Sequence, residues 1–269
     1  MEYLKKQFSL EGSIAVITGG GGTLCGAIAE GFLKAGAKVA LWGRGMASLE
    51  EKKSGLIANG ANPENIGLYE VDLLEESQII TALESTTASM GTIDILVNGV
   101  GGSSTRTSLT EADGADFERI IKLNLVAGCF LPSKYFAAHW IKNKTGGRIL
   151  NIASMASFNP LSGAWGYSAA KAAVMNQTMA YARELASSNI RVNAIAPGFF
   201  LGKQNRALLQ NDDGTPTSRG RDVLDHTPEK RFGNPEELCA AAIFLCSNGA
   251  SFINGITLPV DGGYLCDNI

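Results

Sequence analysis

Short runs of apolar, β-branched residues alternate with longer segments of helical periodicity along this 269-residue chain. Such alternation is typical of repeated strand–helix–strand units, which build a parallel sheet. Right-handed crossovers wind these units into a doubly wound sheet with helices on both faces. The sequence therefore predicts an α/β chain with a single, mostly parallel seven-stranded sheet.

The individual elements can be assigned from this pattern. Seven strands are expected at residues 14–18, 39–42, 66–71, 93–98, 148–152, 191–196 and 256–260. Helices are expected at residues 27–35, 48–58, 77–90, 116–142, 167–187 and 235–246. Doubly wound sheets bind ligands beyond the carboxyl ends of their strands, so the residues that follow each strand are the expected site.

The domain organisation is simple. No repeat or low-complexity linker interrupts residues 1–269, so we expect one domain. The stretch 198–234 breaks the alternation and is rich in polar and turn residues. Long irregular insertions in compact domains are usually functional, and this one follows a strand's carboxyl end, which predicts a substrate lid.

Composition excludes several classes of partner. The net charge is -3 and there is no local run of Lys and Arg, which argues against nucleic acid and anionic membranes. The longest apolar stretches are far shorter than the roughly 20 residues of a membrane span, and the first ten residues do not resemble a secretory signal. Five scattered cysteines and two histidines lack metal-ligand spacing. We expect a cytoplasmic protein with free thiols, no metal and a small-molecule substrate.

A glycine-rich loop follows the first strand. It reads Thr18-Gly19-Gly20-Gly21-Gly22-Thr23-Leu24-Cys25-Gly26 and leads into a helix. Glycines at such a place let the backbone approach a pyrophosphate, and the helix N-terminus faces its charge. We expect a dinucleotide to contact Thr18, Gly19, Gly21, Gly22, Thr23 and Leu24. The alternative is a flexible turn without a ligand.

The second strand is followed by Gly43 and Arg44. NAD-selective folds commonly place a carboxylate there for the ribose 2′-hydroxyl, and none is present. An arginine at this place suits a 2′-phosphate. NADP(H) is therefore favoured, NAD(H) is not excluded, and the alternative is a surface arginine that caps the turn.

Tyr167 and Lys171 lie one helical turn apart, which puts a phenol and an ammonium on one helix face. A tyrosine that acts at neutral pH needs roughly 4 kcal/mol of preferential phenolate stabilisation, which the ammonium and an oxidised nicotinamide could supply. Ser154 follows a strand and would hydrogen-bond the reacting oxygen. Asn124 lies on the preceding helix and would position a water for proton relay. For each of these residues taken alone, the alternative is an ordinary structural role.

Together these residues resemble a short-chain dehydrogenase/reductase from Ser13 to Tyr264. The matching residues are Thr18-Gly19, Asp72, Asn98, Asn124, Ser154, Tyr167, Lys171, Pro197-Gly198 and Val260-Asp261-Gly262-Gly263. The resemblance implies a Rossmann-type fold and hydride transfer between nicotinamide and a carbonyl or secondary alcohol, with Asn124, Ser154, Tyr167 and Lys171 as the catalytic tetrad. It also implies that Asp72 and Leu73 adjoin the adenine, that Asn98, Gly99, Pro197 and Gly198 line the cofactor cleft, and that the chain forms homotetramers.

Three features depart from the family pattern. Thr23 and Cys25 stand where the loop usually has its second and third glycines. The run Asn98-Gly99-Val100-Gly101 replaces the usual Asn-Asn-Ala-Gly. Gly202 occupies a place where a threonine often meets the nicotinamide carboxamide.

The substrate prediction depends on the lid, which resembles that of the family members that act as D-mannonate oxidoreductases. The predicted substrate residues are Trp165, Gln204, Asn205, Arg206 and His226. Their amide, cationic and aromatic groups suit a sugar acid, with D-fructuronate/D-mannonate interconversion expected. The alternatives are a solvated loop, reduction of a 3-oxoacyl thioester or a gluconate-type ketone, a nucleotide-sugar epimerase, and a catalytically silent nucleotide-binding regulator.

Overall fold

The structure, a computed structural model, describes residues 1–103, 106–203 and 205–267. Seven strands form one sheet in the order β3-β2-β1-β4-β5-β6-β7, and every neighbouring pair is parallel. The strands are β1 (Ile14–Thr18), β2 (Lys38–Gly43), β3 (Ile66–Glu70), β4 (Ile95–Asn98), β5 (Gly147–Ile152), β6 (Ile190–Pro197) and β7 (Thr257–Val260). The predicted seven-stranded α/β fold is confirmed. The strand order reverses between β1 and β4, where such sheets open a crevice for ligands.

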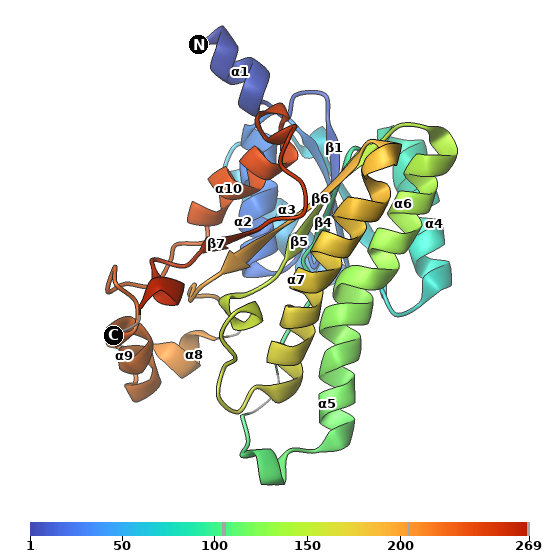
Figure 1. Cartoon of the computed structure of the whole chain (residues 1–269). Helices are drawn as coiled ribbons and strands as arrows, with labels where there is room; N and C mark the ends of the chain where they lie inside the picture. The colour runs from blue at the N-terminus through green and yellow to red at the C-terminus, as the bar shows by residue number, and fades with distance from the viewer. Residues whose placement is uncertain (104–105, 204, 268–269) are drawn as a thin grey trace.

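Helices cover both faces of the sheet (Figure 1). One face carries α2 (Thr23–Lys34), α3 (Met46–Ala58) and α10 (Glu237–Cys246). The other carries α4 (Glu76–Met90), a long helix made of α5 (Gly114–Ile121), η3 (Lys122–Phe130) and α6 (Leu131–Asn143), and α7 (Trp165–Leu185). The sheet therefore has a hydrophobic core on each of its two faces.

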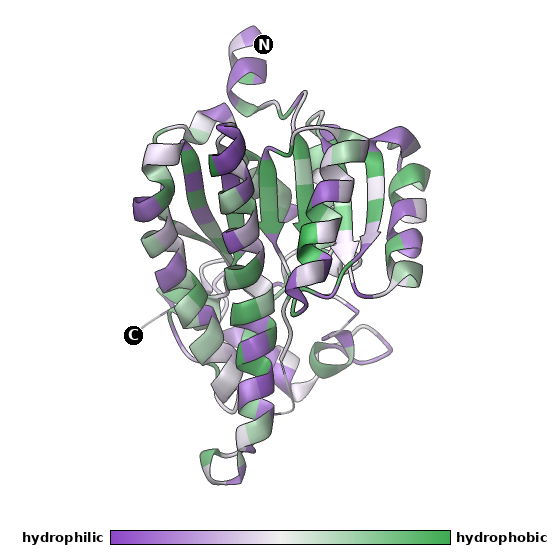
Figure 2. Ribbon diagram, turned by 90° about the vertical axis from the view of Figure 1, so that its right-hand side faces the viewer, coloured by the Kyte–Doolittle hydropathy of each residue, from purple (hydrophilic) through white to green (hydrophobic). Residues whose placement is uncertain are grey.

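The apolar residues of the central strands explain why helices cover both faces of the sheet. Every residue of β1 and β4 is buried, and Figure 2 shows hydrophobic strands between helices of mixed polarity. On the α6 side, Phe136 packs against Trp42 and Trp140, with ring centroids 5.4 and 5.7 Å apart. Both tryptophans are fully buried, so this aromatic cluster anchors α6 to the sheet.

Two predicted helix boundaries differ from the structure. Helix α2 begins at Thr23 rather than Ala27, because Gly22 adopts an extended conformation and forms the N-cap. The helix expected over residues 116–142 contains η3, a π-helical segment, between two α-helical parts. Both differences lie next to the carboxyl ends of strands, where the site is expected.

Two regions were not predicted as helical. The N-terminal α1 (Glu2–Phe8) has no buried residue. The stretch 198–234 contains α8 (Arg206–Leu209) and α9 (Ser218–Asp225), which pack on each other and bury Leu209 and Val223. These helices are too short to give a periodic pattern. In the described part of the chain, no helix is long and apolar enough to cross a bilayer.

Candidate active site

The glycine loop makes a sharp turn between β1 and α2. Gly19 has a φ of 67°, and a Cβ there would lie 3.0 Å from the carbonyl oxygen of Gly99. A glycine is therefore required by both conformation and space. Gly22 caps α2 without a side-chain hydrogen bond, and the first helical turn has no acidic residue. The amides of this turn can bind an anion such as a pyrophosphate.

The two unusual side chains of the loop are each matched by a glycine on a facing segment. A Cβ on Gly99 would lie 2.0 Å from Cys25 Sγ, so the sulfur occupies the space of a side chain at position 99. A Cβ on Gly202 would lie 3.2 Å from Thr23 Oγ1, which also accepts a hydrogen bond from the Lys203 amide at 3.4 Å. Each unusual side chain of the loop is therefore matched by a glycine that leaves room for it: Cys25 by Gly99, and Thr23 by Gly202.

Cys25 is buried, and burial raises the pKa of its thiol to about 11. Its Sγ donates to the Gly99 carbonyl at 3.7 Å. A thiol with a raised pKa is mostly protonated at neutral pH and is a poor nucleophile. Cys25 is therefore a packing residue of the loop.

A buried polar network lies below the loop. Thr18 Oγ1 donates to the Val97 carbonyl at 3.2 Å and accepts from the Gly99 amide at 2.9 Å, which ties β1 to β4. Asn98 Nδ2 donates to Ser133 Oγ and Asn151 Oδ1 at 2.9 and 2.8 Å. The side chain of Asn98 therefore lies in the interior. Only its backbone is placed to line a cofactor cleft.

The residues expected near the adenine follow β2 and β3, and two further cleft residues lie at the end of β6. Arg44 is exposed just beyond β2. Asp72 accepts a hydrogen bond from the Leu74 amide at 3.0 Å, which closes a turn, and Leu73 is buried in the core. Pro197 and Gly198 lie at the end of β6, where a Cβ on Gly198 would be 2.7 Å from Asp261 Cα.

Ser154, Tyr167 and Lys171 come together at the carboxyl end of β5. Ser154 caps the 3-10 turn η4 (Met155–Ser157), where its Oγ accepts from the Ala156 amide at 3.1 Å. Lys171 Nζ lies 5.8 Å from the centroid of the Tyr167 ring and donates to the Ile152 carbonyl at 2.7 Å. The sequence prediction that these three side chains share a site agrees with this placement.

The two titratable groups have shifted pKa values. Burial raises the pKa of Tyr167, and a hydrogen bond with Ser154 opposes that rise. The sequence expectation included the positive charge of an oxidised nicotinamide, and without that charge burial outweighs the partners of the phenol. Burial also lowers the pKa of Lys171 to about 8. The chain by itself therefore does not supply the stabilisation that a phenolate needs at neutral pH.

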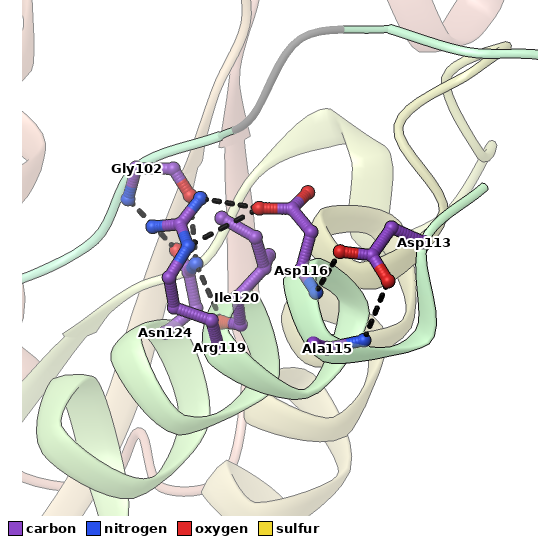
Figure 3. A network of polar contacts seen from close by, with 7 residues as sticks. All are labelled: Gly102, Asp113, Ala115, Asp116, Arg119, Ile120 and Asn124. Carbon is purple, nitrogen blue, oxygen red and sulfur yellow. Dashed lines mark hydrogen bonds and ion pairs between the residues drawn. The ribbon is translucent and has the colours of Figure 1, made fainter.

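Asn124 lies in the π-helical segment, fully buried (Figure 3). Its Nδ2 donates to the carbonyls of Gly102 and Ile120 at 2.7 and 3.0 Å, and its Oδ1 accepts from the Gly102 amide at 3.1 Å. Both amide hydrogens are thus used. A relay water could contact this residue only through Oδ1 or its backbone, so the amide chiefly fixes the Gly102 segment. π-Helical turns are frequent at functional sites.

The π-helical segment also lets the loop after β4 pass close to the helix. A Cβ on Gly128 would lie 2.4 Å from the Val100 carbonyl oxygen. A Cβ on Gly101 would lie 2.6 Å from Asn124 Oδ1 and 3.3 Å from Lys171 Nζ. The loop after β4 is therefore in direct contact with two of the tetrad side chains.

The start of this long helix is fixed separately. Asp113 caps it by accepting from the amides of Ala115 and Asp116 at 3.2 and 3.3 Å (Figure 3). Arg119 then pairs with Asp116 one turn later, with a shortest N–O distance of 2.6 Å. The cap sets where the helix begins, and so which residues reach the site.

Among the described residues, the predicted substrate side chains each make separate local contacts. Trp165 Nε1 donates to the Thr107 carbonyl at 3.2 Å, and its ring borders a surface cavity of about 470 Å³. Asn205 bonds the backbone of Gly202 and Phe200, Arg206 bonds Gln210, and His226 contacts the Asp222 carbonyl. Gln204 lies outside the described residues. The described part of the 198–234 stretch makes many of its hydrogen bonds within itself, which the sequence could not reveal.

Lys171 gives a prediction for stability. Its folded-state pKa of about 8 lies below the ordinary value of 10.5, so the unfolded chain binds more protons between these pH values. Stability should therefore rise with pH across this window, as the cost of burying an ammonium disappears. The free energy of unfolding of the wild type, minus that of Lys171→Met, should increase by up to about 3 kcal/mol from pH 7.5 to 10.5. Urea unfolding of both proteins measures it, and parallel pH profiles would contradict it.

Comparisons with known proteins agree with this geometry. A family profile described as enoyl-(acyl carrier protein) reductase matches residues 23–265. The 2-dehydro-3-deoxy-D-gluconate 5-dehydrogenase of Escherichia coli K12 is 35% identical, with 96% of this chain and 97% of that protein covered. The chain is thus similar to a dehydrogenase over nearly its whole length.

Two solved structures are similar throughout. The gluconate 5-dehydrogenase of Burkholderia cenocepacia J2315, in complex with NADP and tartrate, has a TM-score of 0.88 and 31% identity and covers 98% of this chain and 99% of its own. A Haemophilus influenza protein assigned as a D-mannonate oxidoreductase, with bound NAD, has a TM-score of 0.87 and 33% identity with the same coverage. Both structures place a nicotinamide cofactor on this fold.

Proposed function

Because the chain belongs to the short-chain dehydrogenase/reductase family, whose members are oxidoreductases that act on CH–OH groups, we propose that its substrate is a sugar acid. It interconverts a ketone and a secondary alcohol of that acid with a nicotinamide cofactor. The observation that carries the proposal is the full-length similarity to dehydrogenases named for gluconate derivatives. D-Fructuronate/D-mannonate and 5-ketogluconate/gluconate are the two candidate pairs, and the similarities fit both equally.

Tyr167 is the acid and base of this reaction. In reduction its hydroxyl gives a proton to the carbonyl oxygen, and in oxidation its phenolate accepts the proton of the alcohol. The Ser154 hydroxyl lies close enough to Tyr167 to lower the pKa of its phenol, so both hydroxyls could contact one substrate oxygen. Hydride transfer is the chemistry that the cofactor supplies when bound, and its oxidised form adds a positive charge near the phenol.

Lys171 and Asn124 assist Tyr167 indirectly. The ammonium of Lys171 favours the phenolate of Tyr167 and would also hold the nicotinamide ribose. Asn124 fixes the Gly102 segment, and this segment forms one wall of the site. Neither residue needs to contact the reacting carbon.

The cofactor would lie across the carboxyl ends of β1 and β4. Gly19, Gly21 and Gly22 with the N-terminus of α2 would bind its pyrophosphate, and Asp72 and Leu73 would adjoin its adenine. The absence of a carboxylate at residues 43–45 and the exposed Arg44 favour NADP(H) over NAD(H). The solved relatives include one with NADP and one with NAD.

The remaining proposals concern the lid and the assembly. The 198–234 segment covers the substrate as a lid that starts at the end of β6. A cytoplasmic homotetramer is proposed, supported by exposed apolar side chains on the long helix and α7. These are Phe117, Phe130, Ile141 and Met179. Exposed apolar side chains along helices are candidates for burial in an interface between proteins.

The proposed function is tested with a substrate panel. We expect NADPH-dependent reduction of D-fructuronate or 5-keto-D-gluconate, with a higher kcat/KM than for acetoacetyl thioester. Arg44→Ala should weaken NADPH binding about tenfold while NADH binding changes little, because only the former offers a phosphate for a charge-assisted contact. Preference for the thioester would refute the sugar-acid proposal. Tight cofactor binding without any turnover would support a silent nucleotide-binding protein instead.

A further inference from the structure

The first part of the 198–234 stretch, residues 198–203, runs from β6 to the start of α2, and we call it the strap. In the sheet, β6 lies three strand positions from β1, which is about 14 Å at the usual strand spacing. Gly202 nevertheless contacts Thr23, the first residue of α2, because a Cβ on Gly202 would lie 3.2 Å from Thr23 Oγ1. Five residues span at most about 17 Å, so the strap has just enough length to cross the carboxyl ends of β5 and β4.

Two contacts fix the far end of the strap. The Lys203 amide donates to Thr23 Oγ1 at 3.4 Å. Lys203 Nζ forms an ion pair with Glu51 Oε1, on α3, at 2.5 Å. The chain turns at this place, because Asn205 Oδ1 accepts from the Gly202 amide at 2.8 Å. The strap therefore connects the end of β6 to both α2 and α3.

The strap ends at the helix terminus that would bind the cofactor. Thr23 belongs to the first turn of α2, whose amides are the expected partners of a pyrophosphate. Helix α3 contacts the same glycine loop, because a Cβ on Gly21 would lie 2.7 Å from Ser48 Oγ. The pair of Lys203 and Glu51 then links α3 to the strap. The glycine loop, α3 and the strap thus form a closed ring of contacts at the N-terminus of α2.

We propose that the ion pair of Lys203 and Glu51 is a latch that holds the strap over the pyrophosphate of the cofactor, so that release of the cofactor requires the strap to open. The inference goes beyond the proposed function, since it concerns cofactor release and not the choice of substrate. Both residues are positioning residues, because neither needs to contact the cofactor. Their side chains are 80% and 69% exposed, so the pair is weak enough to open while the lid stays folded.

The threonine of the glycine loop fits this role. At position 23 the family pattern has a glycine, which has no hydroxyl to accept from the Lys203 amide. Gly202 completes the fit, because a larger residue there would press on the threonine side chain. The same departures from the family pattern that alter the loop therefore bring the strap against it.

The test measures how fast NADPH leaves the protein. Glu51→Gln, Lys203→Met and the double variant are loaded with NADPH, and its release is followed by stopped-flow fluorescence after excess NADP⁺ is added. Hydrogen–deuterium exchange of residues 206–226 is measured without any cofactor. Thermal midpoints check that each variant is folded.

Lys5→Met and Glu11→Gln are the matched controls. Lys5 and Glu11 form an ion pair of similar exposure, at 70% and 66%, with an N–O distance of 2.9 Å. Lys5 lies on α1, at the end of the molecule opposite to α8 and α9 (Figure 1). Both control variants should release NADPH at the wild-type rate.

Each single variant of the latch should release NADPH about 1.5- to 5-fold faster than the wild type, the range expected for one exposed ion pair. The double variant should be no faster than the single variants, because all three remove the same pair. Exchange of residues 206–226 should be faster in the variants than in the wild type, since the start of this segment is no longer fixed to α3.

The signs of the two effects separate a latch from a direct action of charge. If the side chains acted on the phosphates by charge alone, Glu51→Gln would slow release and Lys203→Met would speed it. That result, unchanged release or unchanged exchange would each overturn the inference, and the proposed function would stand if the wild type reduces the acids. If the variants release NADPH faster but the wild type reduces no acid, the inference holds and the proposed function fails. Failure of the wild type to bind NADPH or NADH overturns both.

Discussion

Replacing Tyr167 by phenylalanine is expected to lower kcat by about 10²- to 10⁴-fold, because the change removes the group that transfers the proton and little else. The ring remains, so the fold and the packing against Lys171 should persist. Cofactor affinity should change little. Steady-state kinetics with the best acid of the panel and fluorescence titration with NADPH measure the two quantities.

Tyr69→Phe is the matched control for this experiment. Tyr69 lies on β3, and its hydroxyl bonds only to Ser89 among the described residues, away from the site. Its loss should leave kcat unchanged. Retention of more than about a tenth of the wild-type kcat in Tyr167→Phe would contradict the assignment of Tyr167 as the acid and base.

The substitution Gly128→Ala is expected to destabilise the fold by about 1–3 kcal/mol, although alanine normally favours helices. The reason is the Val100 carbonyl oxygen, which would lie 2.4 Å from the new Cβ and belongs to the backbone. Either the β4 loop or the π-helical segment must move. Since this loop contacts Asn124 and Lys171, kcat should fall as well. Urea unfolding and initial rates check the two effects.

Gly55→Ala provides the opposite control. Gly55 lies inside α3, and a Cβ there meets nothing within 4 Å. This variant should therefore be more stable than the wild type by about 0.5–1 kcal/mol. If Gly128→Ala were stabilised to the same degree, the close approach of the β4 loop to the helix could not be as described.

Much of the fold could be predicted because strands in a doubly wound sheet are buried on both faces. Continuous apolar runs such as Ile14–Ile17 therefore mark them to within one or two residues. The start of helix α2 was harder to predict. Its first turns contain Gly26, which reads as part of a flexible loop, whereas in the structure it allows Lys52 to pack closely. Helix propensity alone gives the wrong start at such a place.

The candidate site, like the fold, could be predicted only in part. The tetrad could be found because Tyr167 and Lys171 have a fixed spacing on one helix. The π-helical turn and the bonds that Asn98 makes depend on contacts between distant elements, and no local pattern predicts them.

The pairing of Cys25 with Gly99 limits how this loop can have evolved. A sulfur at position 25 overlaps any side chain at position 99, whereas two glycines can coexist there. A Cβ at position 99 would also lie 2.6 Å from the Thr18 carbonyl oxygen, so a larger residue there needs a movement of the loop as well as the loss of the sulfur. Substitutions at positions 25 and 99 are therefore expected to be non-additive. A library that randomises position 99 alone should recover only glycine, whereas position 25 should also accept glycine.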